Sequence, residues 1–287
     1  MDINSSSSHK NKEPESSVLY IVGTPIGNLN DLSPRALNIL KNVFLVACED
    51  TRQTKKIMSK YKFTNNLVSF NKHNSFKKIP GLIKLLKDEK SIALVSDAGM
   101  PTICDPGENF VNIARTNGIN IVCVPGPCAA LTALVSSGLP SSRFTFEGFL
   151  PKKKSERYSI LLEISQNNKT TILYESPNRL KNLLIELKDC LGGERRIHIS
   201  RELTKKFEEN IGENINEIIA HFKDKDVLGE ITIVIKGRET NEQKEINEFE
   251  LKQELNGLIK AGMSLSQASK YLAKKNNLTK SLIYNLY

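Results

Sequence analysis

Short apolar runs rich in β-branched residues alternate with amphipathic stretches from Val18 onward, and this alternation limits the fold of the 287-residue chain more than any other feature. Runs of this kind predict strands, and the amphipathic stretches between them predict helices. Strands and helices in alternation are typical of α/β folds with largely parallel sheets. The first predicted strands are residues 18–22, 43–47, 67–70, 91–95 and 119–124.

The stretches between these strands repeat apolar residues at positions i, i+3 and i+4, which is the spacing of one face of a helix. Each such face is expected to pack on a sheet, and together these elements form a first domain, residues 18–142. The two clearest sets are Leu82, Leu85 and Leu86, and Leu131, Leu134 and Val135.

The pattern breaks after Phe146, where Pro151 and three lysines predict a linker or an exposed loop. A second α/β series then begins, and we assign residues 143–237 to a second domain. Its predicted strands are residues 170–174, 196–200 and 230–235, and its predicted helices are residues 155–165, 178–190 and 215–222.

The two ends of the chain differ from these domains. Residues 1–17 are rich in Ser, Lys and Glu and have no apolar core, which predicts a disordered leader and not a signal peptide. Residues 238–287 start polar and continue as three short helical patterns, with five lysines and no acidic residue from Leu255 onward. We expect a small basic helical tail there.

Composition narrows the classes of function. No apolar run approaches the ~18 residues that span a bilayer, so we expect a cytoplasmic protein without a membrane segment. Five cysteines without a C-x-x-C pair argue against a disulfide framework and against a zinc site. A net charge of +9 makes a polyanionic partner plausible without identifying it.

Unusual residues gather in the turns that follow the five predicted strands. In an open parallel sheet these turns meet along one edge, where ligands bind near the topological switch point. The fourth turn, residues 96–107, is a long segment with several glycines and prolines around Asp97 and Asp105. The other turns are residues 23–29, 49–52, 71–74 and 125–130.

Several common sites are disfavoured by what these turns lack. No Gly-Lys-Ser/Thr follows a glycine loop, and the first turn has no G-x-G-x-x-G, so a nucleoside triphosphate or NAD is not expected. No two histidines have metal-ligand spacing, and no G-x-S-x-G elbow is present. Only His73 lies in a turn where chemistry is expected, and a purely structural role for it stays open.

Seven motifs, in the same order along residues 18–237, closely resemble the ribosomal RNA small-subunit methyltransferase I family of the tetrapyrrole-methylase superfamily. The resemblance implies a two-domain α/β fold with a parallel-rich sheet in the first domain, a mixed sheet in the second and a helical tail. It implies S-adenosylmethionine as methyl donor, no metal, and 2'-O-methylation of a cytidine in the decoding region of small-subunit ribosomal RNA, usually by a homodimer. The motifs are TPIGNL (24–29), EDTR (49–52), SDAGMPxxxDPG (96–107), PGPCAA (125–130), EGFLP (147–151), YESPxR (174–179) and SRELTK (200–205).

By analogy with the superfamily, the donor is expected in the cleft between the two domains. The residues expected to bind it are Pro25, Ser96, Asp97, Ala98, Gly99, Thr102, Ile103, Cys128, Ala129, Tyr174 and Gly229.

The acceptor side is defined less sharply by the sequence. A methyl group moves by in-line displacement, so the enzyme must align the acceptor hydroxyl and remove its proton. The candidates for this chemistry, among which the sequence does not choose, are Glu49, Asp50, His73, Glu202 and Lys205. The residues expected to contact RNA are Asn28, Arg52, Lys152, Lys153, Lys154 and Arg201.

Two other readings stay open at this stage. A tetrapyrrole C-methyltransferase would share the fold, but its usual G-x-G-x-G-D first turn is replaced here by Gly-Thr-Pro-Ile-Gly. A ribosome-binding protein that has lost catalysis would keep the fold without binding a donor. Methyl transfer to a tetrapyrrole and a donor-binding titration are the observations that separate these alternatives.

Overall fold

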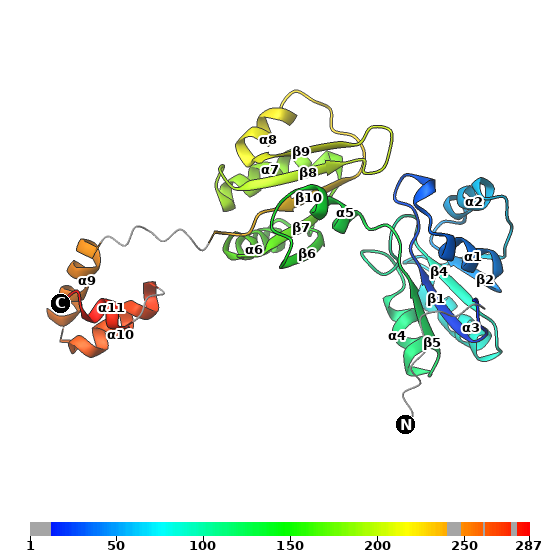
Figure 1. Cartoon of the computed structure of the whole chain (residues 1–287), viewed down its shortest axis with the longest axis horizontal. Helices are drawn as coiled ribbons and strands as arrows, with labels where there is room; N and C mark the ends of the chain where they lie inside the picture. Colours follow the sequence, from blue (N-terminus) through cyan, green and yellow to red (C-terminus); the bar gives the residue numbers. More distant parts are fainter. Residues whose placement is uncertain (1–12, 240–247, 261, 277–279) are drawn as a thin grey trace. The chain divides into compact units, whose positions relative to one another are not determined.

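The computed structural model describes residues 13–239, 248–260, 262–276 and 280–287. The chain divides into two compact units, one up to Arg238 and one from Glu239 onward. The larger unit contains two five-stranded sheets (Figure 1). Most of the predicted leader, residues 1–12, lies outside the described part of the chain.

The first sheet is entirely parallel, with strand order β3-β2-β4-β1-β5. Because β1 lies inside this sheet, alternate residues of it are buried on opposite faces. Tyr20 packs in the core that contains α1 (Pro34–Asn42), whereas Leu19 packs in the core that contains α3 (Ser75–Lys87) and α4 (Glu108–Thr116). The strands are β1 (Val18–Val22), β2 (Leu45–Cys48), β3 (Leu67–Ser69), β4 (Ile92–Val95) and β5 (Asn120–Val124); α2 (Thr51–Lys60) follows β2.

The second sheet is mixed, with strand order β6-β7-β10-β8-β9. Only β6 and β7 run parallel, and the other neighbours are antiparallel. Its strands are β6 (Phe144–Phe149), β7 (Thr170–Glu175), β8 (Arg196–Arg201), β9 (Glu209–Asn214) and β10 (Ile231–Ile235). Residues from α6 (Lys154–Gln166), α7 (Pro177–Leu191) and α8 (Ile215–Phe222) share one core with this sheet.

The helix α5 (Ala129–Ser136) shows where the sequence pattern misleads. Leu131 and Val135 were expected to face a sheet, but they are 49% and 80% exposed. Instead α5 buries Ala130, Ala133 and Leu134 in a core with β7 and β10 of the second sheet. The apolar spacing was correct for a helix, but its buried face is the one that carries the smaller residues.

Two strands were missed. No strand was predicted between residues 143 and 154, yet this segment contains β6, which pairs with β7 and has a register shift between Phe146 and Gly148. The segment after Arg201 contains β9, an edge strand whose Glu and Asn residues hide the usual strand pattern. Charged residues on an edge strand discourage pairing with other chains, which explains this composition.

The predicted leader also differs from expectation where it is described. Glu13 accepts hydrogen bonds from Arg35 Nε and Nη2 at 2.7 and 2.6 Å, and the Glu15 amide donates to the Tyr20 hydroxyl at 2.8 Å. Residues 13–17 are therefore held against the first domain.

The smaller unit consists of α9 (Glu248–Lys260), α10 (Leu265–Asn276) and α11 (Lys280–Tyr284). It has its own small core, in which Leu255, Leu272 and Ile283 are fully buried. The predicted helical tail is thus confirmed as helical. In the described ranges, no helix is long and apolar enough to cross a membrane.

Candidate active site

The turns after β1, β4 and β5 meet at the carboxyl ends of these strands, as predicted. A Cβ atom placed on Gly126 would lie 2.7 Å from Gly23 Cα, so only glycine at both positions allows this approach. Thr24 and Gly99 exchange backbone hydrogen bonds at 2.9 and 3.1 Å, which joins the first turn to the fourth. Three segments distant in sequence therefore form one rigid floor.

The fourth turn, residues 96–107, has an irregular backbone. Gly99, Thr102 and Cys104 have φ values of 82°, 74° and 65°, in the left-handed region. For the two residues that carry a side chain this conformation is strained, and such strain is concentrated at functional sites. Ser96 is buried and its Oγ donates to the Ala98 and Gly99 carbonyls, so it holds the backbone of the turn in place.

A cavity of about 400 Å³ lies over this floor, and we call it the apolar cavity. Turns that follow strands of the first sheet contribute to it, together with strands of the second sheet. One wall is aromatic, because the Tyr174 ring lies edge-on to Phe146 at 5.1 Å and tilted against Phe149 at 5.5 Å. The lining residues are Ile26, Asp97, Ala98, Gly99, Met100, Ile103, Cys104, Asp105, Cys128, Ala129, Phe149, Tyr174, Glu175, Ser176, Pro177, Gly229, Glu230, Ile231 and Thr232.

Tyr174 also connects β7 to α5 by a hydrogen bond. Its hydroxyl oxygen accepts from the Ala130 amide at 3.1 Å, in the first turn of α5. The N-cap residue of that helix, Cys128, makes no side-chain capping bond. The Tyr174 hydroxyl therefore replaces the cap, and burial raises the pKa of this phenol so that it stays protonated.

A second cavity, which we call the polar cavity, has a volume of about 430 Å³ and lies at the ends of β2 and β3. The Asp50 amide donates to Asp97 Oδ1 at 2.9 Å, so the rims of the polar and apolar cavities share a hydrogen bond. The residues around the polar cavity are Glu49, Asp50, Thr51, Arg52, Ser69, Asn71, Lys72 and His73.

Three carboxylates stand where the two cavities adjoin. Burial raises the pKa of Glu49, Asp97 and Asp105 above their ordinary values. Neighbouring carboxylates add to this effect, since Glu49 lies near Asp105 and Asp97. A group of desolvated carboxylates of this kind attracts a cationic ligand and supplies a base of useful strength.

Asp50 has a different role from its neighbour Glu49. It is the N-cap of α2 and accepts from the Arg52 amide at 2.8 Å, while the Arg52 guanidinium donates to both its carboxylate oxygens. Hydrogen bonds from Arg52 lower the pKa of Asp50 to about 2. The Arg52 side chain remains 85% exposed beside the polar cavity.

The connection after β8 brings Glu202 and Lys205 next to Glu230, which lines the apolar cavity. Lys205 Nζ pairs with Glu202 at 2.8 Å and with Glu230 at 2.9 Å. Burial alone would raise the pKa of Glu202, but hydrogen bonds from Lys205 and the Glu230 amide outweigh it and the net shift is downward. Burial acts to lower the pKa of Lys205, yet the two carboxylates raise it, so the group stays charged.

The remaining predicted residues lie as follows. Pro25 is buried and, like Ser96 and Thr102, does not line the apolar cavity. Asn28 caps a short 3-10 helix (Leu29–Asp31), and its backbone N–H donates to Thr204 Oγ1 at 3.0 Å. Arg201 pairs with Glu209 at 2.9 Å beside a third cavity. Lys152, Lys153 and Lys154 are exposed; the first two lie between β6 and α6, and Lys154 is the first residue of α6.

Sequence reasoning missed several residues that the cavities contain. Asp105 was visible in its Asp-Pro-Gly motif but received no role. Phe149 belongs to the EGFLP motif but received no role, and Thr232 was taken as an ordinary strand residue. No group of three His, Cys, Asp or Glu side chains able to hold a metal ion occurs among the residues that the structure describes.

Comparisons with known proteins agree with this architecture. A family model described as Tetrapyrrole (Corrin/Porphyrin) Methylases matches residues 18–219. A protein of Thermotoga maritima named Ribosomal RNA small subunit methyltransferase I is 45% identical, over 77% of this chain and 99% of its own length. The chain belongs to the small-subunit methyltransferase I family of tetrapyrrole methylases. Members with the same name from Vibrio cholerae and Bacillus subtilis are 42% and 40% identical, over 93% and 96% of both chains.

Solved structures place this family member in the expected fold. Uroporphyrin-III-C-methyltransferase of Thermus thermophilus superposes with a TM-score of 0.56 at 17% identity, covering 77% of this chain and 94% of that one. A cobalt precorrin-4 methyltransferase reaches 0.59 at 13% identity, covering 77% and 95%. The predicted two-domain tetrapyrrole-methylase-like fold, with a parallel first sheet and a mixed second sheet, is confirmed.

Proposed function

We propose that this protein transfers a methyl group from S-adenosylmethionine to the 2'-hydroxyl of a cytidine in the decoding region of small-subunit ribosomal RNA. The observation that carries the proposal is the pair of adjoining cavities. One is apolar and aromatic, and the other is polar and holds a carboxylate, Glu49, of raised pKa. Donor and acceptor can thus be held separately and meet at the Asp50–Asp97 hydrogen bond.

The apolar cavity fits the donor in size and chemistry. Its volume of about 400 Å³ lies in the usual range for small-molecule sites. The aromatic wall at Tyr174 suits a nucleoside base, and the partly buried carboxylates of Asp97 and Asp105 suit a ligand that carries positive charge. When bound, S-adenosylmethionine supplies an electrophilic methyl group, and no metal is needed.

Glu49 is our candidate for the general base. A base needs a pKa that leaves it both ionised and basic at the working pH, and burial moves Glu49 in this direction. Asp50, with a pKa of about 2, is too weak a base and holds Arg52 instead. Lys205 is held in its charged form by its carboxylate partners, which suits it to binding and not to proton removal. His73 lies beside the polar cavity, where it can contact the acceptor nucleotide.

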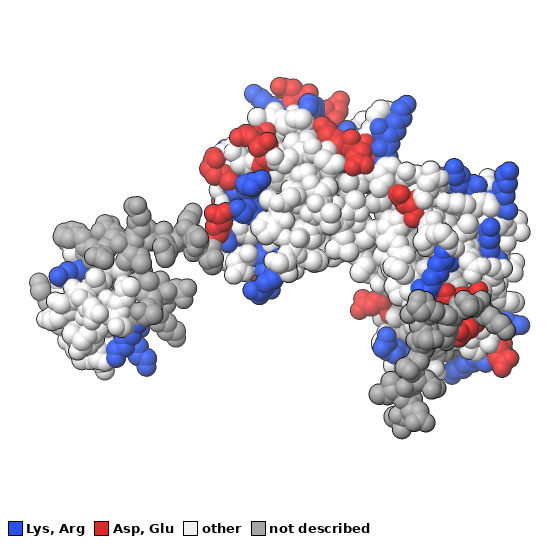
Figure 2. All heavy atoms as spheres, viewed as in Figure 1, with Lys and Arg blue, Asp and Glu red and all other residues white. Residues whose placement is uncertain are grey.

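Basic side chains around the polar cavity supply the contacts with RNA. The exposed side of α2 has four cations and no carboxylate, namely Arg52, Lys55, Lys56 and Lys60. Acidic side chains gather instead over α8 and β9, in the upper middle of Figure 2. We therefore place the RNA on the side of α2, with Lys152, Lys153, Lys154 and the basic tail as further phosphate contacts.

A homodimer is part of the proposal, together with action in the cytoplasm, where the ribosomal substrate is. Leu131 and Val135 form an exposed apolar strip on α5 that a second copy would cover. We expect Val135→Glu to shift the protein from dimer to monomer in analytical ultracentrifugation. An unchanged sedimentation coefficient would place the interface elsewhere.

The experiment that tests the function uses small subunits from cells that lack the corresponding methyltransferase activity. The purified protein is incubated with them and with methyl-labelled donor, and the modified nucleotide is mapped by its resistance to alkaline cleavage, which requires a free 2'-hydroxyl. We expect label at one cytidine of the decoding region. Glu49→Gln should lower the rate by about 10² to 10⁴, whereas Glu163→Gln, on the exposed side of α6, should not change it.

Two outcomes contradict the proposal. Label on a base or on a tetrapyrrole offered in parallel would assign a different acceptor. Donor binding by calorimetry without any transfer to small subunits would indicate a ribosome-binding protein that has lost catalysis.

A further inference from the structure

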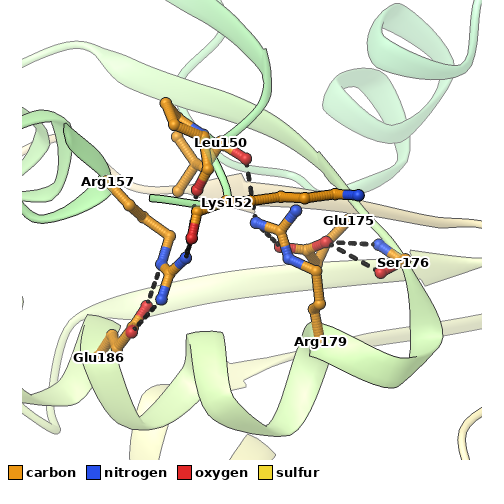
Figure 3. A network of polar contacts seen from close by, with 8 residues as sticks. Leu150, Lys152, Arg157, Glu175, Ser176, Arg179 and Glu186 are labelled. Carbon is orange, nitrogen blue, oxygen red and sulfur yellow. Dashed lines mark hydrogen bonds and ion pairs between the residues drawn. The ribbon is translucent and has the colours of Figure 1, made fainter. Parts of the chain in front are cut away.

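Two arginines hold the backbone of the segment from the end of β6 to the start of α6, which carries the lysine triplet. Their guanidinium groups donate to main-chain carbonyls of consecutive residues, as Figure 3 shows. The carbonyls belong to Leu150, Pro151 and Lys152. We call residues 150–154 the basic loop.

Arg157, in the first turn of α6, uses all of its donor nitrogens. Its Nη1 donates to the carbonyls of Pro151 and Lys152 at 3.2 and 3.0 Å. Its Nε and Nη2 donate to the two oxygens of Glu186, on α7, at 2.7 Å each. The side chains of Arg157 and Glu186 are only 16% and 24% exposed, so the guanidinium is held in a partly desolvated environment. A lysine has one nitrogen and cannot make this set of contacts.

Arg179, on α7, holds the start of the basic loop. Its Nη2 donates to the Leu150 carbonyl at 3.0 Å and lies 3.2 Å from Glu175 Oε2. Glu175 is 2% exposed, and its other oxygen accepts from the Ser176 amide at 2.6 Å. Within the described residues, Glu175 Oε2 has no hydrogen bond of good geometry, so this ion pair is what balances its charge.

The basic loop borders the apolar cavity. Phe149, which precedes the loop, lines that cavity, as do Glu175 and Ser176. In Figure 3 the Lys152 side chain extends away from Arg157 toward the side of the network where Glu175 and Ser176 lie. A phosphate contacted by this loop would therefore belong to a nucleotide close to the reacting one.

Positive charges outnumber negative charges around the basic loop. Within the described part of the chain, Lys152 forms no ion pair. Lys154 lines a further cavity with Glu186 and Asp189 and helps to lower the pKa of Glu186, but it does not come within ion-pair distance of either carboxylate. Neighbouring lysines repel one another. A loop whose backbone is not held by other residues would lose backbone and side-chain conformational entropy on binding RNA. Fixing three successive carbonyls removes the backbone part of that loss beforehand. The cations are Lys152, Lys153, Lys154, Arg157 and Arg179, and the carboxylates near them are Glu156, Glu175, Glu186 and Asp189.

We propose that Arg157 and Arg179 are positioning residues, which preorganise the basic loop so that Lys152 and Lys154 bind a backbone phosphate of the RNA next to the methylated nucleotide. This inference rests on the proposed function and deepens it. Neither arginine lines the apolar or the polar cavity, and their effect passes through the conformation of the loop.

The test exchanges the guanidinium fork for a single amine at constant charge. Arg157→Lys should raise the KM for small subunits about 3- to 10-fold, the size expected for ordering one or two side chains on binding. The Kd for the donor, measured by calorimetry, should not change. Trypsin should cleave more rapidly after Lys152–Lys154, because the loop is no longer held. Arg179→Lys should have the same three effects through Leu150, and serves if the first variant does not fold.

A double-mutant cycle shows whether the lysines transmit the effect. In a protein that already carries Lys152→Ala and Lys154→Ala, Arg157→Lys should add less than twofold to KM. Arg35→Lys is the matched control, because Arg35 forms the same kind of fork with Glu13 at 2.7 and 2.6 Å but lies on α1. It should leave the KM for small subunits unchanged.

The outcomes separate this inference from the proposed function. If the wild-type protein does not methylate small subunits, the proposed function fails and the inference falls with it. If the wild type is active and Arg157→Lys has a normal KM, only the inference is overturned. It is also overturned if donor Kd rises in parallel with KM, or if the effects of Arg157→Lys and of the two lysine substitutions on KM multiply independently.

Discussion

Replacing Tyr174 with phenylalanine removes one oxygen atom that connects β7 to α5 and leaves the aromatic wall in place. The ring contacts with Phe146 and Phe149, at centroid distances of 5.1 and 5.5 Å, do not involve the hydroxyl. What is lost is the acceptor for the Ala130 amide at 3.1 Å. Because Cys128 offers no side-chain cap, nothing else near the start of α5 replaces it among the described residues.

The expected cost is that of losing a helix cap, about 1 kcal/mol. For a chain of this size the unfolding midpoint should fall by ~2–4 °C. The start of α5 contributes Cys128 and Ala129 to the apolar cavity, so a similar free energy should be lost from donor binding. A loss of ~1 kcal/mol corresponds to a rise in the donor Kd of about fivefold.

Differential scanning calorimetry and a donor titration measure the two effects on the same preparation. Tyr158→Phe is the matched control, because Tyr158 lies on α6 and is 53% exposed. It should change neither quantity. A Tyr174→Phe protein with the wild-type midpoint and the wild-type donor Kd would refute the capping role of this hydroxyl.

Three further predictions concern other parts of the molecule. Burial raises the pKa of Asp105, so its ionised form destabilises the fold. This cost is absent below ~pH 4 and appears as the pH rises through the folded-state pKa. Asp105→Asn should therefore raise the unfolding midpoint at pH 7 but not at pH 3.5, and it should weaken donor binding. Gly126→Ala should lower the free energy of unfolding, measured by urea titration, by ~1–3 kcal/mol, because its Cβ would meet Gly23 at 2.7 Å. Gly81 in α3 has open space around it, so Gly81→Ala should raise the free energy of unfolding by ~0.4–1 kcal/mol. Deleting residues 239–287 should flatten the salt dependence of subunit binding without changing the donor Kd. The slope of log K against log salt concentration should become shallower by ~0.7–0.9 for each lysine that contacts a phosphate. An unaltered slope would show that the tail does not touch RNA.

The sequence was sufficient for the parallel sheet because its strands are buried on both faces. Such strands are continuous apolar runs that stand out from their surroundings, as β1 and β4 do. It was insufficient for β9, where an edge position favours Glu and Asn, and for β6, whose register shift at Gly148 breaks the alternation. The buried face of α5 was missed because Ala130 and Ala133 are small, and helix faces were judged from large apolar residues.

For the candidate site, motifs located the turns but did not give the direction of each side chain. Ile26 lines the apolar cavity but its neighbour Pro25 does not, and Asp97 and Gly99 line it but Thr102 of the same motif does not. The roles of Glu49 and Asp50 depend on burial and on the Arg52 fork, and neither property can be read from adjacent letters of the sequence. Whether these residues act on RNA as proposed stays a prediction.

The hydrogen bond from Ala130 to Tyr174 has a consequence for the order of folding during synthesis. The helix α5 is made before the acceptor of its amide, which follows 44 residues later in the chain. At ~5–20 residues per second the ribosome needs about 2–9 s to add that segment. The start of α5 therefore stays uncapped until Tyr174 has been made. Amide hydrogen exchange at Ala130 should be rapid in a fragment of residues 18–142 and slow in the whole chain.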